Sequence, residues 1–287
     1  MTKIDDTELI LNSKKKIYHL NLSKDEIADD IILVGDPGRV KQISCKFDSI
    51  QYKISNREFT THTGILRGKK LSVISTGIGT DNIDIVINEL DALANINFKT
   101  RTANLHKKSL NLIRLGTSGA LQKDIKVDSF LVSSYAIGFD GLAYFYSNKS
   151  NINIEIGTAF QCHALWPNEL ATPYCIKASK KLFDKFSDIN SGITATATGF
   201  YGPQGRKLRL SPSILDLHEK MESFNYNRNR ITNFEMETSA LYYLGQTLGH
   251  NTLTICAIIG NRLTGKHSKD YKKTISKMID LVLSRIC

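Results

Sequence analysis

Apolar, β-branched runs alternate with stretches of helical periodicity along the chain, and this alternation limits the possible folds more than any single motif. Residues 30–35 and 252–259 are of the buried-strand type, whereas apolar side chains recur at helical spacing over 83–94. No Pro/Gly/Ser-rich linker and no internal repeat interrupts the alternation. We therefore predict an α/β fold: a single domain over 17–287 with a mixed central β-sheet flanked by helices, after a polar, lysine-rich arm over 1–16.

The same patterns predict further elements. Strands are expected at 59–66, 71–76, 127–134 and 192–198, and helices over 171–183, over 213–221 and opening at 233–237. The Asp-Pro-Gly at 36–38 is typical of a turn. Residues 99–109 are polar and basic, which indicates a surface excursion, and the poorly patterned stretch 135–170 indicates loops near a site or an interface.

Composition narrows the class of protein. The chain has 287 residues, of which 41% are hydrophobic, so a substantial core can form. No apolar run is long enough to span a bilayer, and the N-terminus lacks the charged-then-apolar pattern of a signal peptide. The five cysteines are scattered without metal-type spacing, as expected of reduced thiols. These features predict a cytoplasmic protein with no membrane partner and no metal site formed by cysteines.

The charge balance points to anionic partners. Lysine and arginine number 38 against 28 acidic residues, which gives a net charge of +10. The lysines occur in short, dispersed groups without a basic face or interleaved aromatic residues, so a nucleic-acid partner is not favoured. A protein that binds a nucleoside or RNA without catalysis stays as an alternative, based on this charge and on the 99–109 segment.

Residues 112–122 differ from the other apolar runs because a charged residue lies inside them. Arg114 interrupts the run, and an arginine in a core strand needs a partner for its guanidinium. After it, Thr117 and Ser118 lie between two glycines, which we expect to form a turn whose hydroxyl and N–H groups face an anion. An arginine fork beside such a nest suits phosphate. An ordinary turn, with Arg114 reaching the surface, explains the sequence equally well.

Polar groups also follow the other predicted strands, where ligands of α/β sheets usually bind. These groups are Gly35 with Arg39, Phe200 with Gln204 and Arg206, and Asn261 with Arg262, while Glu235 and Glu237 supply an acid pair. The sequence has no Ser-His-Asp series, zinc motif or P-loop, and its Gly-x-Gly at 77–79 lacks the rest of a dinucleotide fingerprint. The remaining groups are arginines, an acid pair, an aromatic residue and an amide. Such a set would suit a phosphate, a sugar diol and a flat heterocycle.

Seven short segments, in order over roughly 18–265, resemble nucleoside phosphorylase family I. They are residues 18–20, 35–40, 56–61, 75–79, 114–122, 200–206 and 234–237. The resemblance implies a pentosyltransferase that catalyses reversible phosphorolysis of uridine to uracil and ribose 1-phosphate. Inorganic phosphate would be the co-substrate, and no cofactor is implied.

The resemblance also implies the roles of individual residues. Those expected to bind phosphate are Gly35, Arg39, Arg57, Arg114 and Thr117. Those expected to bind ribose are His19, Met236 and Glu237, and those expected to bind the base are Phe200, Gln204, Arg206 and Arg262. The catalytic set would be Arg39, Arg114, Thr117 and Glu237. Since His19 and Arg57 would come from a neighbouring subunit, the resemblance implies a homo-oligomer, a dimer or a hexamer, with shared active sites.

Some of these residues also have simpler explanations. Glu235 could complete a capping box with Thr232, and Arg262 could form an ordinary salt bridge. Members of the family can hold a monovalent cation between subunits near the positions of Glu58 and Ile78. The usual serine of that site is Asn82 here.

The base preference follows from the resemblance as well. Purine phosphorylases of the family protonate the base with an Asp after the strand that matches 255–259, and residues 259–262 contain no acid here. We therefore expect a pyrimidine nucleoside as substrate. The order Gly202-Pro203 is exchanged relative to the family, and the 99–109 segment is an addition. A broader pyrimidine or purine specificity, or hydrolysis instead of phosphorolysis, stays as an alternative.

Overall fold

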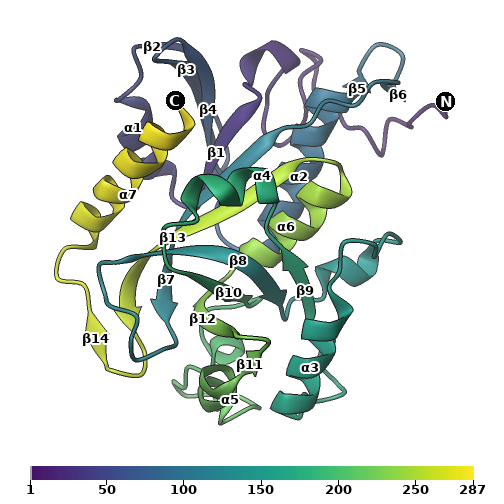
Figure 1. The fold of residues 1–287 in the computed structure, drawn as a ribbon. Coiled ribbons are helices and arrows are strands. Elements are labelled where there is room, and N and C mark those ends of the chain that lie inside the picture. The colour runs from purple at the N-terminus through teal and green to yellow at the C-terminus, as the bar shows by residue number, and fades with distance from the viewer. Residues whose placement is uncertain (1) are drawn as a thin grey trace.

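The computed structural model describes residues 2–287 and confirms the predicted α/β fold (Figure 1). Strands from all parts of the chain lie side by side in a central sheet, with helices packed around it. The twelve strands of this sheet are β1 (Asp30–Val34), β2 (Ser49–Asn56), β3 (Phe59–Leu66), β4 (Lys69–Ser75), β7 (Asn111–Ala120), β8 (Phe130–Gly138), β9 (Tyr174–Lys177), β10 (Ser191–Thr196), β11 (Asn225–Tyr226), β12 (Asn229–Glu235), β13 (Asn251–Asn261) and β14 (Lys266–His267).

Five of the strands close into a ring. The order along the sheet is β11-β12-β10-β8-β13-β7-β1-β4-β3-β2, and β12 also pairs with β7. The ring therefore runs through β7, β13, β8, β10 and β12. The closing contact is antiparallel and places Phe234 opposite Gly119. Because β7 also pairs in parallel with β1 and β13, the carboxyl ends of these three strands lie at one edge. The predicted site residues Gly35 and Arg262 follow two of these ends.

The helices cover the sheet according to their apolar faces. They are α1 (Pro37–Ser44), α2 (Thr80–Asn95), α3 (Ile154–Ala164), α4 (Lys180–Phe183), α5 (Leu217–Ser223), α6 (Thr238–Thr247) and α7 (Tyr271–Ile286), with short 3₁₀ turns η1 (Lys24–Glu26), η2 (Leu142–Phe145), η3 (Asp184–Phe186) and η4 (Gly202–Gln204). Helix α2 buries Ile83, Val86, Ile87 and Leu90 at the predicted helical spacing and packs beside α6 (Figure 1). Helices α1 and α7 lie together on the other side of the picture, where α1 contacts β3 and β4 and α7 contacts β13.

The segment predicted as an arm lies against a small hairpin. Strands β5 (Ile96–Asn97) and β6 (Thr102–Ala103) form this hairpin, of which β6 lies inside the predicted surface excursion and β5 just before it. The backbone N–H of Ile4 donates to the carbonyl of Arg101, and the Arg101 guanidinium donates to the carbonyls of Ile4, Asp5 and Leu9. Leu9 is buried in the main core. One arginine thus fastens residues 4–9 to the hairpin.

The glycine-flanked turn predicted after Arg114 is wrong. Strand β7 continues through Gly116, Thr117, Ser118 and Gly119 to Ala120. Pairing with β13 continues to Ala120, and β12 pairs on the other side at Gly119 and Ala120, so strand pairing overrides the local turn preference. The segment is therefore an extended strand and not a turn.

Other local predictions fail as well, two of them because of strand pairing. Residues 171–183 contain β9, which pairs with β8, and only the one-turn helix α4. Residues 233–235 end β12 in place of opening a helix. The 36–38 turn is the start of α1, capped by the side chain of Asp36, which accepts the N–H of Gly38 at 2.8 Å. Helix α3 lies within the segment expected as loops.

The described residues 2–287 lack two features. None of their helices is both long and apolar enough to cross a membrane. Their His, Cys, Asp and Glu side chains form no group of three or more that could hold a metal ion.

Candidate active site

Arg114 is the centre of a buried ionic cluster on β7. Its Nη1 lies 3.1 Å from Oε2 of Glu235, and its Nη2 donates to Oε2 of Glu237. The three side chains are at most 5% exposed. A buried guanidinium is tolerated only where carboxylates neutralise it, so the partner that the sequence required is this acid pair at the end of β12. The alternative in which Arg114 reaches the surface is wrong.

Backbone groups fix the Glu237 carboxylate. Its Oε1 accepts the N–H of Gly79 at 3.1 Å, and its Oε2 accepts the N–H of Met236 at 3.2 Å. Burial raises the pKa of Glu237 to about 7, and the neighbouring Glu235 adds to this rise against the opposing effect of Arg114. Glu237 is therefore a fixed acceptor whose ionisation lies near neutral pH, with Met236 next to it.

Glu235 holds the start of α6. Its carboxylate accepts the N–H groups of Glu237 and Thr238 at 3.1 Å and the hydroxyl of Thr196 at 2.7 Å. The capping box with Thr232 that the sequence suggested is wrong, because the Thr232 hydroxyl donates to the carbonyl of Ile193. Glu235 thus caps a helix and neutralises Arg114 at the same time.

Arg39 brings a second guanidinium to the same strand. It comes from α1, and its Nη1 donates to the carbonyl of Leu115 at 3.0 Å. Its side chain is buried, and burial together with the charge of Arg114 lowers its pKa. Two guanidiniums that repel each other in a buried place form a site that an anion stabilises.

Glycines leave the room that these arginines need. A Cβ on Gly116 would lie 2.0 Å from Nη1 of Arg114, so only glycine lets that side chain lie along β7. Gly35 follows β1 and is half-buried, and the position of its missing Cβ is 3.4 Å from the carbonyl of Gly77. Thr117 lies on β7 just beyond Leu115 and is also half-buried. Of the predicted phosphate residues, the structure thus gathers Gly35, Arg39, Arg114 and Thr117 around the ends of β1 and β7.

A second polar cluster surrounds the side chain of Gln204. Its Oε1 accepts from Nη1 of Arg206 at 2.6 Å and from Nη2 of Arg262 at 2.7 Å. Gln204 is buried, whereas Phe200 is 51% exposed and stacks on Arg206, with its ring centroid 3.6 Å from the guanidinium carbon. Because two donors occupy Oε1, the amide orientation is fixed and Nε2 is the group turned toward other acceptors. The four predicted base residues therefore form one unit.

The base cluster adjoins the acid pair through the backbone. Nε2 of Gln204 is 3.5 Å from the carbonyl of Glu235, and the missing Cβ of Gly119 would lie 3.6 Å from Nε of Arg262. Arg262 therefore lies over β7. The sequence also allowed an ordinary salt bridge for Arg262, but no carboxylate of the described residues lies within 4.0 Å of its guanidinium. Anion site, acid pair and base cluster follow one another along a single edge.

Comparisons with known proteins agree with this arrangement. A model of the "Phosphorylase superfamily" matches residues 29–285. The chain belongs to this superfamily. The uridine phosphorylase of Thermococcus kodakarensis is 30% identical over 89% of this chain and 81% of its own length, and the DeoD-type purine nucleoside phosphorylase of Clostridium novyi is 30% identical over 92% and 97%. The crystal structure of a Trypanosoma brucei nucleoside phosphorylase, described as showing uridine phosphorylase activity, superposes with a TM-score of 0.86 at 28% identity, over 96% of this chain and 98% of that one.

Superfamily membership confirms the family and the type of fold that the seven segments predicted. Two predicted residues, His19 and Arg57, however, make their contacts outside the cluster around Arg114. The ring of His19 contacts Glu89, with 2.7 Å between Nδ1 and Oε1, and Arg57 lies over the ring of Tyr18. Asn56 joins these residues by donating to the carbonyl of His19 at 2.7 Å. His19 and Arg57 thus belong to a small group of their own, joined through Tyr18 and Asn56.

The contacts near Ile78, Asn82 and Glu58 show which atoms lie at the predicted cation site. A monovalent cation needs several oxygen ligands, and the carbonyl of Ile78 accepts Nδ2 of Asn82 at 3.3 Å. Nδ2 would also lie 2.4 Å from a Cβ on Gly77, next to the side chain of Glu58. Within one chain, Asn82 therefore bonds to the Ile78 carbonyl in the place where the family has a serine. A monovalent cation between subunits stays a prediction.

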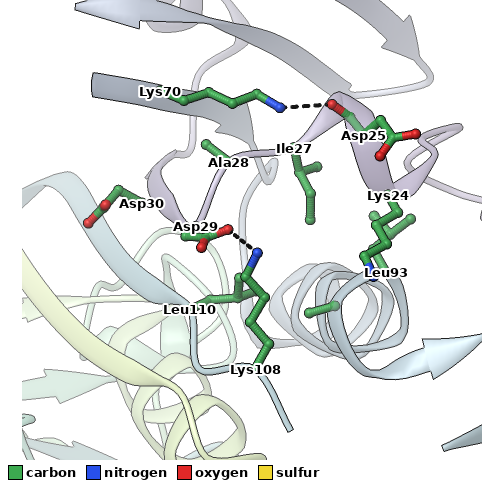
Figure 2. Close-up of a pocket in the computed structure, with 11 residues that line it drawn as sticks. Lys24, Asp25, Ile27, Ala28, Asp29, Asp30, Lys70, Leu93, Lys108 and Leu110 are labelled. Carbon is green, nitrogen blue, oxygen red and sulfur yellow. Dashed lines mark hydrogen bonds and ion pairs between the residues drawn. The ribbon is translucent and has the colours of Figure 1, made fainter. Parts of the chain in front are cut away.

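A hollow of about 450 Å³ at the opposite edge of the sheet is not part of the site (Figure 2). It lies at the amino end of β1, where Asp30 begins the strand. Its lysines point to protein groups: Lys108 pairs with Asp29, and Lys70 donates to the carbonyl of Asp25 at 2.9 Å. The ammonium groups of Lys70 and Lys108 are thus held by protein groups, at the end of β1 away from Gly35.

Three residues of the site were missed by reasoning from the sequence. Thr196 holds Glu235, the N–H of Gly79 holds Glu237, and His218 contacts the base cluster. Gly79 was part of a resembling segment, so its position could have been suspected. Thr196 and His218 carry no local signal, because Glu235 and Arg262, which they contact, lie 39 and 44 residues away along the chain.

Proposed function

We propose that the chain is a uridine phosphorylase, which transfers the ribosyl group of uridine to inorganic phosphate and releases uracil. The observation that supports this most is the pair of clusters along one edge: two buried arginines around β7, and a glutamine oriented by two further arginines. The first cluster suits phosphate, the second suits the carbonyl and N–H edge of a pyrimidine, and Glu237 lies beside them for the ribose hydroxyls.

In this proposal the arginines position the nucleophile. Arg39 and Arg114 would hold phosphate below the sugar, with Gly35 and Thr117 beside it, so that a phosphate oxygen attacks C1′. Glu237 would accept hydrogen bonds from the 2′- and 3′-hydroxyls while Met236 packs on the sugar. Because phosphate is itself the nucleophile, no side chain needs to form a bond to the substrate.

The base cluster would stabilise the leaving group. As the bond from C1′ to N1 breaks, its electron pair passes to uracil, which gains negative charge, while the sugar gains positive charge. Arg206 and Arg262 have no carboxylate partner within 4.0 Å among the described residues, so their positive charge is available to this anion. Phosphate would stabilise the sugar cation from the other side.

The position of Asn261 supports a pyrimidine over a purine. Asn261 lies in the region, residues 259–262, where the resemblance leads us to expect the acid of the purine enzymes. Its Nδ2 donates to the carbonyls of Gln122 and Ile125 at 2.9 and 2.8 Å, and its Oδ1 accepts the N–H groups of Leu263 and Thr264. All of these bonds run to the backbone, so this side chain has no proton to give to N7 of a purine.

The test is a product assay. Purified protein is incubated with uridine, with and without inorganic phosphate, and the products are separated by chromatography. Uracil that forms only with phosphate supports the proposal, and uracil without phosphate would indicate hydrolysis. Inosine and thymidine are assayed in parallel, because the purine enzyme of C. novyi is as similar in identity as the uridine enzyme of T. kodakarensis. No release from any nucleoside would leave RNA binding as the next hypothesis to test.

We also propose a homo-oligomer in which His19 and Arg57 complete a neighbour's site. Their separation from Arg114 and Glu237 in one chain supports this. A cytoplasmic location is part of the same proposal, supported by the five cysteines Cys45, Cys162, Cys175, Cys256 and Cys287, which are free.

A further inference from the structure

The imidazole of His218 lies against the two groups that orient Gln204. His218 belongs to α5, and its Nε2 is 2.5 Å from Nη1 of Arg262 and 2.8 Å from the carbonyl oxygen of Gln204. The same Nη1 donates to that carbonyl at 2.6 Å, while Nη2 holds Oε1 of the Gln204 side chain at 2.7 Å. An imidazole nitrogen, a guanidinium and a carbonyl therefore meet at one point beside the base cluster.

This contact favours one protonation state of the ring. A guanidinium stays charged and can only donate, so a hydrogen bond across the 2.5 Å contact makes Nε2 the acceptor, whereas the Gln204 carbonyl at 2.8 Å becomes a partner of Nε2 only when that nitrogen carries a proton. The imidazole is then neutral, with its proton on Nδ1. A second proton on Nε2 would bring one N–H against another.

The charges around the ring oppose protonation. Arg262 faces it from the end of β13, Arg206 from the loop after η4, and Glu219 from its own helix. Burial lowers the pKa of His218, and the two arginines lower it further, against smaller opposing effects of the Gln204 carbonyl and Glu219. The ring is thus neutral at pH 7 and titrates below its usual range.

We infer that His218 is a positioning residue for base recognition: the neutral ring holds Arg262 on Gln204, and the protonated ring releases it. A proton taken from solvent at Nε2 makes a new N–H that donates to the Gln204 carbonyl and displaces Nη1 of Arg262. The added positive charge then repels Arg262 and Arg206. Gln204 loses one of the two donors that fix its amide, although no base has been touched. This inference rests on the proposed function, since it assumes that Gln204 and Arg262 read the base.

The experiment compares wild-type protein with His218→Gln over about pH 5 to 8. A glutamine oxygen can accept from Arg262 but does not titrate. At fixed phosphate we expect similar kcat/KM for uridine in both proteins at pH 8. Below the His218 pKa, the ratio of wild type to variant should fall, approaching tenfold for each pH unit. Both proteins meet the same phosphate ionisation and the same Glu237, so only His218 can separate the two profiles.

Two further variants separate positioning from packing. His218→Leu removes the acceptor and should lower kcat/KM about three- to tenfold at every pH. His163→Gln is the matched control, because this exposed histidine of α3 also contacts α5, at the carbonyl of Lys220 and the hydroxyl of Ser223, both at 3.0 Å. It should keep the wild-type profile.

A second measurement does not need a folded variant. Uracil and a proton on His218 should exclude each other, so saturating uracil should lower the His218 pKa in a histidine NMR titration of the wild type. A flat kcat/KM ratio, or a His218 pKa that uracil leaves unchanged, overturns the inference. Failure of the proposed function would look different: the wild type would release no uracil with phosphate at any pH.

Discussion

Nη1 of Arg114 and Oε2 of Glu235 lie 3.1 Å apart, between side chains that are 5% and 2% exposed. This ion pair joins the anion site on β7 to the segment that carries Glu237. The position of the proposed nucleophile and that of the proposed ribose acceptor are therefore set by the same contact.

Replacing Glu235 with Gln should destabilise the protein and slow the reaction. The amide keeps the shape but leaves Arg114 with one carboxylate, which we expect to lower the free energy of unfolding by about 1–3 kcal/mol. Denaturant unfolding measures this loss. Asp184→Asn is the control, since it removes an exposed pair with Lys180 and should cost less than about 0.5 kcal/mol. Equal effects of the two variants would contradict the special role of the buried pair.

Gly116→Ala should displace Arg114 without removing it. The new Cβ would lie 2.0 Å from Nη1, so the guanidinium has to leave its position. Since the proposed phosphate site depends on that position, we expect kcat/KM for phosphate to fall about a hundredfold. Gly202→Ala, whose Cβ would meet nothing within 4 Å, should change it little. Initial rates at varied phosphate test both variants, and a wild-type rate in Gly116→Ala would count against the phosphate assignment.

Gln204→Ala should affect the base end of the reaction alone. The change removes the shared acceptor of Arg206 and Arg262, which would then repel each other without a bridge. We expect kcat/KM for uridine to fall about a hundredfold while the apparent affinity for phosphate stays within about twofold. A matching loss at the phosphate end would mean that the two clusters do not act separately.

Asn261→Asp should not create a purine phosphorylase. A carboxylate cannot donate to the carbonyls of Gln122 and Ile125, so it would face two acceptors in a buried place. We expect a loss of about 2–3 kcal/mol in stability and no gain in inosine phosphorolysis. Thermal unfolding and the product assay check the two parts. Inosine turnover in this variant would show that the side chain can turn toward the base.

Subunit mixing tests the shared site. Arg57→Ala and Glu237→Gln should each be nearly inactive, because each removes one part of a proposed composite site. When the two are refolded together, some sites would combine an intact Arg57 with an intact Glu237, so activity should return to about a quarter of the wild-type level in a dimer with random pairing. No recovery, together with proven mixing, would contradict a site shared between subunits.

Much of the fold could be predicted because its signals are local. The apolar runs that became β1, β3, β4 and β13 and the helical spacing of α2 depend only on neighbouring residues. Residues 116–119 and 233–235 failed because distant strands pair with them. Tyr174–Lys177 failed likewise, since its partner is β8. Pairing between strands that are far apart in the sequence leaves no local trace.

The site divides in the same way. Arg114 could be predicted as a site residue because it is a charge in an apolar strand. The acid pair, Glu235 and Glu237, could also be identified in the sequence. Nothing local connects Arg114 to those acids 121 and 123 residues later, and nothing marks His218 as a neighbour of Arg262. The residue types were therefore predictable, whereas their partners came from the resemblance or from the structure.

The closed ring of strands has a consequence for how such enzymes diversify. The pairing of Gly119 with Phe234 locks the anion strand to the segment that leads into Glu237, so neither can shift without opening the ring. Phe200, Gln204 and Arg206 instead lie on a long connection between β10 and α5, outside the ring. Substitutions in this connection can therefore change which heterocycle is bound. The strands that carry the anion site and lead to Glu237 stay the same, so the transfer reaction is kept.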